Sequence, residues 1–367
     1  MTTATARAPR LSWAVLSPLI ALLVLALTWG RKPGTVVVVV VAVVLGAAVL
    51  SAVTHAEIVA HRVGEPFGSL VLAVAVTVIE VALIVTLMVS GGPETSSLAR
   101  DTVFAAVMIT CNGIVGLALL VGGLRYSVIL FNAEGTGAAL ATIATLATLS
   151  LVLPTFTTSR PGPEFSPAQL TFAALASVIL YGLFVLTQTV RHRDFFLPVT
   201  SAGEVVGAEE HADPPTPRAA LASVGLLLAA LVAVVGLAKV ESPAIEAGVA
   251  AIGFPPSFVG VVIALLVLLP ETLAATRAAR RDRLQTSLNL AFGSAIASIG
   301  LTIPAIAVAS IWLPGPLLLG LAPTQMVLLA VTFVVATLTV VPGRATRLQG
   351  AVHLLLVAAF VFLAIYP

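Results

Sequence analysis

An apolar run that ends on a carboxylate decides the fold of this chain: Phe67-Gly-Ser-Leu-Val-Leu-Ala-Val-Ala-Val-Thr-Val-Ile-Glu80. Apolar stretches of about 20 residues span the hydrocarbon core of a bilayer as helices. The pattern returns 191 residues later, where Phe258 opens a run that ends on Glu271. Five of the 14 aligned positions are identical. The shared Glu is the informative identity, because a carboxylate is rare inside a membrane span.

The composition indicates that the whole chain, and not only these two runs, belongs in a membrane. The protein has 367 residues, of which 59% are hydrophobic and 9% are charged, with a mean hydropathy of +1.13. A soluble domain carries about 25% charged residues, so the excess apolar surface must face a lipid bilayer. The net charge of +2 gives no support for nucleic-acid binding. The single cysteine, Cys111, excludes a disulfide framework.

The apolar runs predict an all-α integral membrane protein with about eleven transmembrane helices. The expected spans are 11–30, 34–54, 66–90, 101–123, 136–158, 167–190, 218–238, 254–277, 285–311, 321–341 and 348–366. One extra helix precedes two sets of five, and Glu80 and Glu271 lie in the second span of their sets. Because five is odd, the two sets must be inverted relative to each other, as in many secondary transporters. The predicted units are an extra helix (1–33), a first repeat (34–190), a linker (191–217) and a second repeat (218–367).

The positive charges predict the orientation. Thirteen of the 18 Lys and Arg residues fall on one side if the N-terminus is cytoplasmic, against five on the other. This bias favours a cytoplasmic N-terminus and an outside C-terminus in a multi-pass protein of the cell (inner) membrane. The linker is then cytoplasmic. It carries an acidic run at 204–213 and is broken by Pro214, Pro215 and Pro217, which indicates a flexible connection, with a cation-sensing loop as the alternative. The sequence does not indicate an oligomeric state.

Glu80 and Glu271 are the candidate ligands. They are the acidic residues expected deep inside apolar spans, and no Lys or Arg is expected there to neutralise them. A charge at bilayer depth costs about 2.5–3.5 kcal/mol on insertion scales, so it normally faces the interior and serves an ion or proton path. Burial disfavours the charged carboxylate. We therefore expect the pair to hold protons when empty and to release them to an entering metal cation; a structural pair of carboxyls is the alternative.

Polar and helix-breaking residues surround this pair in the sequence. Thr77 lies one turn before Glu80, and Pro270, directly before Glu271, removes a backbone hydrogen bond and frees a carbonyl. The span after each Glu is also polar, which favours an ion-lining role or, alternatively, close helix packing. The candidates there are Asn112 in the first set and Ser287, Ser294, Ser298 and Thr302, which share one helical face, in the second.

Other motifs indicate no enzyme. His55, Glu57 and His61 resemble a zinc motif, but the two His are six residues apart instead of four. We interpret them as a polar loop near the membrane surface, at a possible ion entry. The chain has no phosphate-binding loop, nucleophile elbow or dinucleotide fingerprint, so neither catalytic activity nor a bound cofactor is expected.

The sequence resembles the ChaA-type (calcium, sodium–potassium)/proton antiporters of the Ca²⁺:cation antiporter superfamily. The resemblance rests on Gly64-Glu65-Pro66-Phe67-Gly68, on Thr77-Val78-Ile79-Glu80, on Leu269-Pro270-Glu271, and on the long block from Arg280 through Gly293-Ser294-Ala295-Ile296-Ala297-Ser298 to Thr302. It covers nearly the whole chain.

The resemblance implies that Glu80 and Glu271 bind the transported cation or protons, with Asn112 and Ser294 on the polar positions of the following helices. Related calcium/proton exchangers carry Asn three residues before each Glu, where this chain has Thr77 and Leu268. With Ala297 in place of a Gln, fewer oxygens surround the site, so Ca²⁺, Na⁺ and K⁺ all stay open as substrates. Cation/cation exchange, or a non-transport intramembrane protein, is the alternative function.

Overall fold

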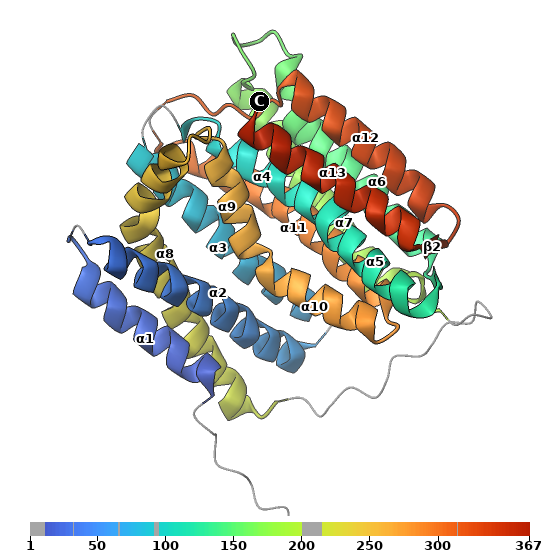
Figure 1. Ribbon diagram of the computed structural model, residues 1–367, viewed down its shortest axis with the longest axis horizontal. Helices are drawn as coiled ribbons and strands as arrows, with labels where there is room; N and C mark the ends of the chain where they lie inside the picture. Colours follow the sequence, from blue (N-terminus) through green and yellow to red (C-terminus); the bar gives the residue numbers. More distant parts are fainter. Residues whose placement is uncertain (1–11, 32, 65–66, 92–94, 200–214, 314) are drawn as a thin grey trace, which may run out of the picture.

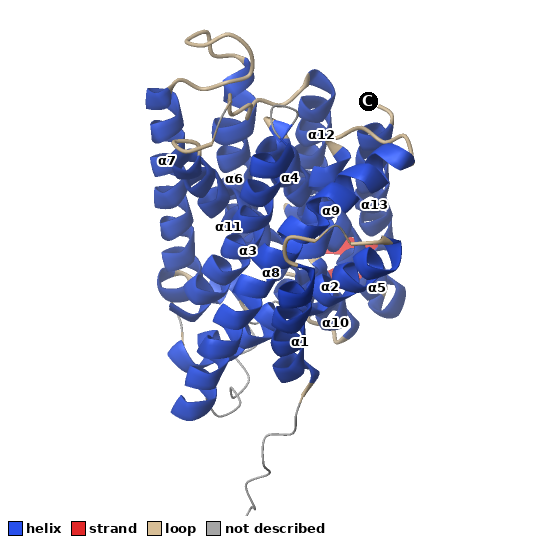
Figure 2. Ribbon diagram, turned by 90° about the vertical axis from the view of Figure 1, so that its left-hand side faces the viewer, coloured by secondary structure: helices blue, strands red, loops and turns tan. Residues whose placement is uncertain are grey.

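The computed structural model describes residues 12–31, 33–64, 67–91, 95–199, 215–313 and 315–367. Most of this chain is helical, and the helices stand side by side as one bundle (Figure 1, Figure 2). Apolar runs fold this way in lipid because a helix satisfies its own backbone hydrogen bonds. The acidic run at 204–213, and Glu65 and Pro66 of the quoted motif, lie outside the described residues.

The first half of the chain is divided as follows. The helices up to the first strand are α1 (Trp13–Thr28), α2 (Thr35–Val63), α3 (Phe67–Gly91), α4 (Leu98–Met108), the π-helix η2 (Ile109–Ile114) and α5 (Val115–Tyr126). Strand β1 (Val128–Leu130) precedes α6 (Ala133–Ala147), η3 (Thr148–Val152), η4 (Leu153–Thr155), α7 (Pro167–Leu186), η5 (Thr187–Arg191) and η6 (Arg193–Phe196).

The second half begins with a long helix. Its elements are α8 (Pro217–Ala251), α9 (Phe258–Val267), α10 (Leu269–Arg280), α11 (Leu284–Ala309), α12 (Pro323–Val340), β2 (Arg344–Thr346) and α13 (Arg347–Ile365). The two strands pair antiparallel, with Ile129 opposite Ala345, and so join the end of α5 to the start of α13 (Figure 2).

Every expected span coincides with a helix, but not every helix is a long, straight span. Within the described ranges, nine helical segments are long and apolar enough to cross a membrane. A tenth span requires α9 and α10 to count together across a 54° bend, and α1 is shorter, at 16 residues. The all-α membrane fold is therefore confirmed, whereas the count of eleven is not.

Reciprocal helix packing supports the two sets of five. Helix α7, the last span of the first set, packs on α11, the third span of the second; α13, the last of the second set, packs on α5 in the third span of the first. At these contacts a Cβ on Gly300 of α11 would lie 2.9 Å from Cβ of Tyr181, and one on Gly116 of α5 would lie 3.0 Å from Cβ of His353. The exact unit boundaries stay a prediction.

Helices α1, α2 and α8 form a group at one side of the bundle (Figure 1). His55 of α2 ties the group together, because its Nε2 donates to the Ala14 carbonyl of α1 (2.9 Å) and its Nδ1 lies 3.3 Å from Ser223 Oγ of α8. The predicted polar loop at 55–61 is therefore wrong. The helix α2 continues through it to Val63 because a buried histidine with two partners is tolerated inside the packed group.

Helix α8 also runs further than expected, to Ala251 instead of about residue 238. Glu241 and Glu246 consequently lie within the helix and not in a loop, and the Glu241 side chain is only 3% exposed. We expected Glu80 and Glu271 to be the only carboxylates inside apolar spans. Glu241 corrects that expectation. Neighbouring helices bury Glu241, and hydropathy along the chain cannot show that packing.

The centre of the bundle is the segment α4–η2–α5, of which 83% is buried in its most apolar window. It packs against α9, α11 and α13. Phe104 of this segment and Phe292 of α11 are among the largest fully buried side chains. This rigid centre positions α11, and α11 in turn contacts α3 and α10, which carry the two glutamates.

Candidate functional site

Glu80 lies in the middle of α3 and faces α11. Its side chain is 3% exposed, and Ser298 Oγ of α11 donates a 2.7 Å hydrogen bond to Glu80 Oε1. Thr302, one turn further along α11, is fully buried on the same helical face. The serine stripe read from the sequence thus turns toward the carboxylate at Ser298. At its other end the stripe only packs, because Ser287 Oγ donates to the Ala275 carbonyl of α10 (2.7 Å).

Glu271 lies in the same region of the bundle as Glu80, but its local structure is different. The chain breaks at Leu268, between α9 and α10, and Pro270 and Glu271 lie in the first turn of α10. Pro270 therefore starts a new helix, where its missing N–H costs no hydrogen bond, instead of kinking one continuous helix. The first turn is the positive end of the helix dipole and favours a carboxylate. Glu271 Oε2 is buried and has no hydrogen-bond partner among the described residues.

Both glutamates line one cavity of about 170 Å³. This volume holds several water molecules. Predicted residues Thr77, Ser294 and Ser298 line it with Glu80 and Glu271. The other lining residues come from α3, α4, α7, η5, α9 and α11: Leu72, Ala73, Val76, Ala106, Tyr181, Phe184, Val185, Gln188, Ala264, Val267, Leu268, Asn289, Leu290, Gly293 and Ala297.

The cavity is electrostatically negative. Its lining, all of it in the described part of the chain, contains no Lys, Arg or His. Glu57, outside this lining, lies in α2 and not in a surface loop. The missing positive charge must come from a proton or from a bound cation.

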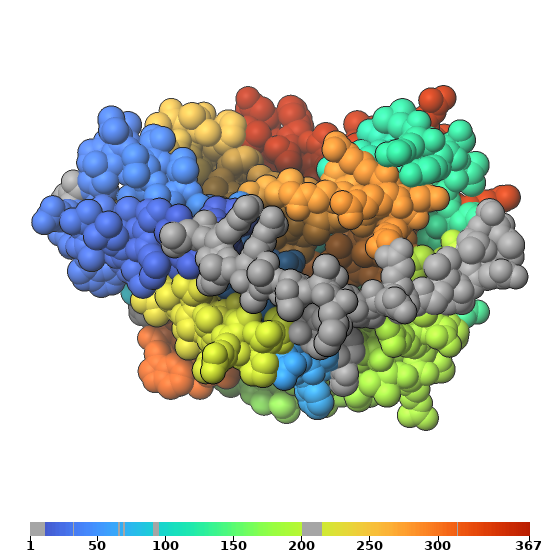
Figure 3. All heavy atoms as spheres, turned by 90° about the horizontal axis from the view of Figure 1, so that it is seen from below, coloured from blue at the N-terminus to red at the C-terminus, as the bar shows by residue number. Residues whose placement is uncertain are grey.

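The cavity extends from the glutamates toward one end of the bundle. Leu72 near the start of α3, Gln188 near the end of the α7–η5 helix, and Asn289 near the start of α11 all line it. Chain direction places these three positions at the end where α8 begins and α10 finishes. Figure 3 looks onto that end, with the start of α8 in yellow and the last turns of α10 in orange.

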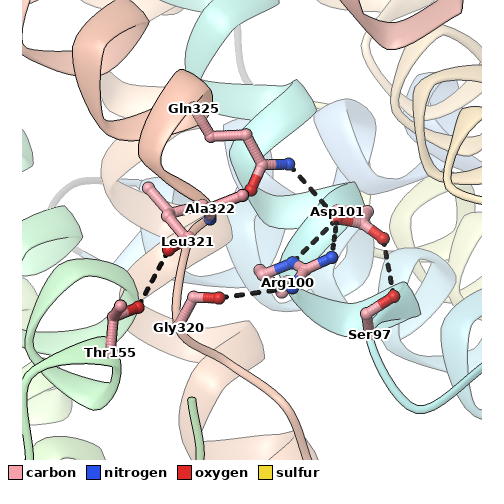
Figure 4. A network of polar contacts seen from close by, with 8 residues as sticks. All are labelled: Ser97, Arg100, Asp101, Thr155, Gly320, Leu321, Ala322 and Gln325. Carbon is pink, nitrogen blue, oxygen red and sulfur yellow. Dashed lines mark hydrogen bonds and ion pairs between the residues drawn. The ribbon is translucent and has the colours of Figure 1, made fainter. Parts of the chain in front are cut away.

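At the opposite end lies a group of polar contacts around Asp101, which we call the Asp101 network (Figure 4). Asp101, 4% exposed, accepts from Arg100 Nε (2.8 Å), Ser97 Oγ (2.9 Å) and Gln325 Nε2 (3.4 Å). Arg100 also donates to the Gly320 carbonyl (3.3 Å). The network joins the start of α4 to the start of α12.

The extended segment before α12 forms backbone hydrogen bonds at the same end of the bundle. Its backbone N–H groups donate to three other parts of the chain: Leu318 to Ser96, Gly320 to Pro163 and Leu321 to Leu151. Thr155 Oγ1 donates to the Leu321 carbonyl (2.9 Å; Figure 4). Gly320 is required here because a Cβ would lie 2.4 Å from Thr155 Oγ1.

Asn112 does not line the cavity. It lies in the π-helix η2 and is fully buried in a second polar group, which we call the Asn112 cluster, with Thr332, Thr339 and His353. Asn112 Nδ2 donates to Thr332 Oγ1 (2.9 Å), so Asn112 Oδ1 accepts from His353 Nδ1 (3.2 Å). His353 Nε2 lies 3.1 Å from Thr339 Oγ1. The polar side chains of this buried cluster therefore hydrogen-bond to one another.

The part of the cavity lining that α7 and η5 contribute was not predicted from the sequence. Tyr181 and Phe184 of α7 and Gln188 of η5 line the cavity. Gln188 carried a usable signal, since it is an amide inside the expected span 167–190. Tyr181 carried none, because its place depends on the close contact of α7 with Gly300.

The arrangement suits a hard cation. Two carboxylates and the hydroxyls of Thr77, Ser294 and Ser298 are oxygen donors, which Ca²⁺ and the alkali-metal ions prefer. Among the described residues no cluster of three or more His, Cys, Asp or Glu side chains is gathered for a metal.

Comparisons with known proteins agree with this geometry. The chain is 46% identical over 99% of its length to y4hA of Sinorhizobium fredii (98% of that protein), which its name describes as an ionic transporter. It is 33% identical to the sodium-potassium/proton antiporter ChaA of Escherichia coli, over 94% of this chain and 93% of ChaA. The fold matches the crystal structure of the H⁺/Ca²⁺ exchanger CAX with a TM-score of 0.69 and 18% identity, covering 95% of this chain and 86% of CAX. Residues 33–190 and 222–366 match the sodium/calcium exchanger protein family, and the chain belongs to that family.

Proposed function

We propose that this protein is a secondary active antiporter that exchanges a cation for protons across the membrane, with Glu80 and Glu271 binding either species. The observation that carries the proposal is the shared cavity, in which two carboxylates meet without any basic side chain. Support also comes from relatives that are named a sodium-potassium/proton antiporter and an H⁺/Ca²⁺ exchanger.

Competition for the same oxygens couples the two fluxes. In the empty cavity, protons neutralise the carboxylates, because two like charges at this depth are costly. An entering cation replaces the protons and takes additional oxygens from Ser298, Thr77 and Ser294. Since each ligand excludes the other, net transport of one drives the other in the opposite direction. The mixed set of carboxylates and hydroxyls accommodates Ca²⁺, Na⁺ or K⁺.

Alternating access follows from the difference between the two ends of the bundle. The cavity leads toward the end where α8 begins. We infer that the other end, where the Asp101 network joins α4 to α12, is the closed one. Inverted repeats allow one set of helices to rock against the other around a fixed midplane site. The break between α9 and α10, beside Glu271, is a natural pivot. The linker-bearing end, on the cytoplasmic side by charge bias, is thus the open one.

The test is proton flux in vesicles. Purified protein is reconstituted with a pH-sensitive dye inside, and Na⁺, K⁺ or Ca²⁺ is pulsed outside against a preset pH gradient. Antiport dissipates the gradient for the transported ions and not for a buffer pulse. Glu134→Gln is the matched control, since Glu134 is exposed in the first turn of α6 and outside the cavity. Cation uptake with no proton movement would overturn the proposal.

Cation/cation exchange is the second candidate, because the matched family is described as a sodium/calcium exchanger family. The same vesicles separate the two mechanisms. Exchange of one cation for another would continue with a proton ionophore present and with equal pH on both sides, provided that the counter-cation is inside. Proton antiport needs no counter-cation.

A further inference from the structure

A groove between α1 and α8 has the features of a lipid site. It is apolar and about 600 Å³ in volume. Its walls are Leu22, Leu25, Ala26 and Trp29 on the α1 side and Leu231, Val232, Val235 and Gly236 on α8. From Leu22 to Trp29 the groove follows α1 for about 10 Å. Leu25 reaches over Gly236, where a Cβ would lie 2.5 Å from the leucine.

A basic pocket of about 580 Å³ adjoins this groove, and Trp29 lines both. Arg31, just after α1, and Lys239 of α8 supply its charges. The lining, taken over the described residues, contains no acidic side chain. Lys239 Nζ lies 5.3 Å from the centre of the Trp29 ring, and Trp29 is 55% exposed.

The charges of Arg31 and Lys239 are not neutralised by any described residue that lines the pocket. In the described part of the chain, neither Arg31 nor Lys239 forms an ion pair. They come from different elements, yet they face one pocket at the end of α1, where an apolar helix meets the polar membrane interface. Tryptophan is enriched at that depth. Basic pockets between transmembrane helices attract the headgroups of anionic lipids.

We propose that this groove binds an anionic phospholipid, with its phosphate between Arg31 and Lys239 and an acyl chain along α1 and α8. The continuity of an apolar groove with a cationic pocket is the pattern of an amphipathic anion. A partner helix would fill the groove and leave both cations unneutralised. A free phosphate would use the pocket and leave the groove unused.

The site would also hold α1, the helix that precedes the two sets of five, against α8. Helix α1 already contacts α2 and α8. A lipid between α1 and α8 adds a bridge at the end opposite to His55, whose bond to Ala14 fixes the start of α1. Bound lipid should therefore raise the unfolding temperature of the full chain.

Native mass spectrometry of the full chain tests the proposal with phosphatidylglycerol and phosphatidylcholine of identical acyl chains. We expect retained phosphatidylglycerol and weaker retention of phosphatidylcholine. Arg31→Gln and Lys239→Gln should each weaken phosphatidylglycerol binding about fivefold, because one cation near the headgroup is lost. Lys239→Arg should keep it. Arg62→Gln is the matched control, since Arg62 is exposed near the C-terminal end of α2.

Three results would overturn the proposal. Equal retention of the two lipids would remove the role of the cations. Competition by inorganic phosphate at concentrations that leave bulk lipid unaffected would assign the pocket to a free anion. A dimer that dissociates in Lys239→Gln, with no change in lipid retention, would assign the groove to a second copy of the chain.

Discussion

The helix pair α7–α11 and the helix pair α5–α13 occupy reciprocal places in the bundle, yet their polar groups differ in state. Beside α11, Glu80 and Glu271 share a cavity, and Glu271 Oε2 has no partner among the described residues. Beside α5, the Asn112 cluster is packed, and its side chains hydrogen-bond to one another. Both regions put polar side chains inside the membrane, but only one leaves capacity for a ligand.

This difference distinguishes polar groups that bind a ligand from polar groups that only stabilise the fold inside a membrane. A buried polar group costs little once it is hydrogen-bonded, so a saturated cluster is explained by packing alone. A carboxylate with spare oxygens and adjoining space is costly unless something binds it. We therefore propose ion binding at the Glu80–Glu271 cavity and a structural role for the Asn112 cluster.

The largest expected effect is on the cavity carboxylates. Glu80→Gln and Glu271→Gln should each reduce exchange at least about 100-fold, because an amide of the same size cannot alternate between proton and cation. Membrane insertion should be unchanged. Flux per inserted protein in vesicles measures this, with Glu134→Gln as control. Exchange that survives in either variant would exclude that residue from the site.

The pH dependence of cation affinity tests whether protons and cations share the two carboxylates. Protons and cations compete for one pair of carboxylates, so apparent cation affinity should rise with pH. The change is up to about tenfold per pH unit for each proton displaced. A divalent ion that displaces two protons gives the steeper slope, and the titration belongs to the pair. Affinity from vesicle flux across acid to alkaline pH measures it. A flat profile with intact transport would separate the proton and cation sites.

Ser298→Ala should have an intermediate effect. It removes the donor that stabilises the ionised form of Glu80 at 2.7 Å. A hydrogen bond to a charged group contributes about 1.5–3 kcal/mol, so cation affinity at a fixed pH should fall roughly tenfold. At higher pH the affinity should recover, since fewer protons compete. Ser287→Ala is the comparison, because Ser287 is on the same stripe but bonds to Ala275. If the two variants behave alike, Ser298 acts only in packing.

The smallest effect on transport is expected in the Asn112 cluster. His353→Ala leaves Asn112 Oδ1 and Thr339 Oγ1 without their partner, which should cost about 1–3 kcal/mol of stability. Exchange per folded protein should stay within about twofold, because the Asn112 cluster does not line the cavity. Thermal unfolding in detergent and vesicle flux on the same preparation separate the two. A normal melting temperature together with a tenfold loss of cation affinity would restore Asn112 as an ion ligand.

The membrane class and the two proposed ligands could be predicted from the sequence. Composition alone requires lipid-facing helices, and Glu80 and Glu271 are recognisable because carboxylates are so costly inside apolar runs. Ser298 was predicted from helical spacing on α11. These features are local, since each depends on residue type and on positions along one helix.

Which polar residues meet depends on how the helices pack in the folded bundle. Asn112 and Ser294 are equally good candidates in the sequence, but one faces the Asn112 cluster and the other the cavity, because helix rotation is set by neighbours such as α13. Tyr181 enters the site only through the close approach of α7 at Gly300. Likewise, His55 continues a helix because Ala14 and Ser223, far away in the chain, satisfy its ring. Hydropathy is a property of one segment, whereas burial and hydrogen-bond satisfaction belong to pairs of segments that only the folded bundle brings together.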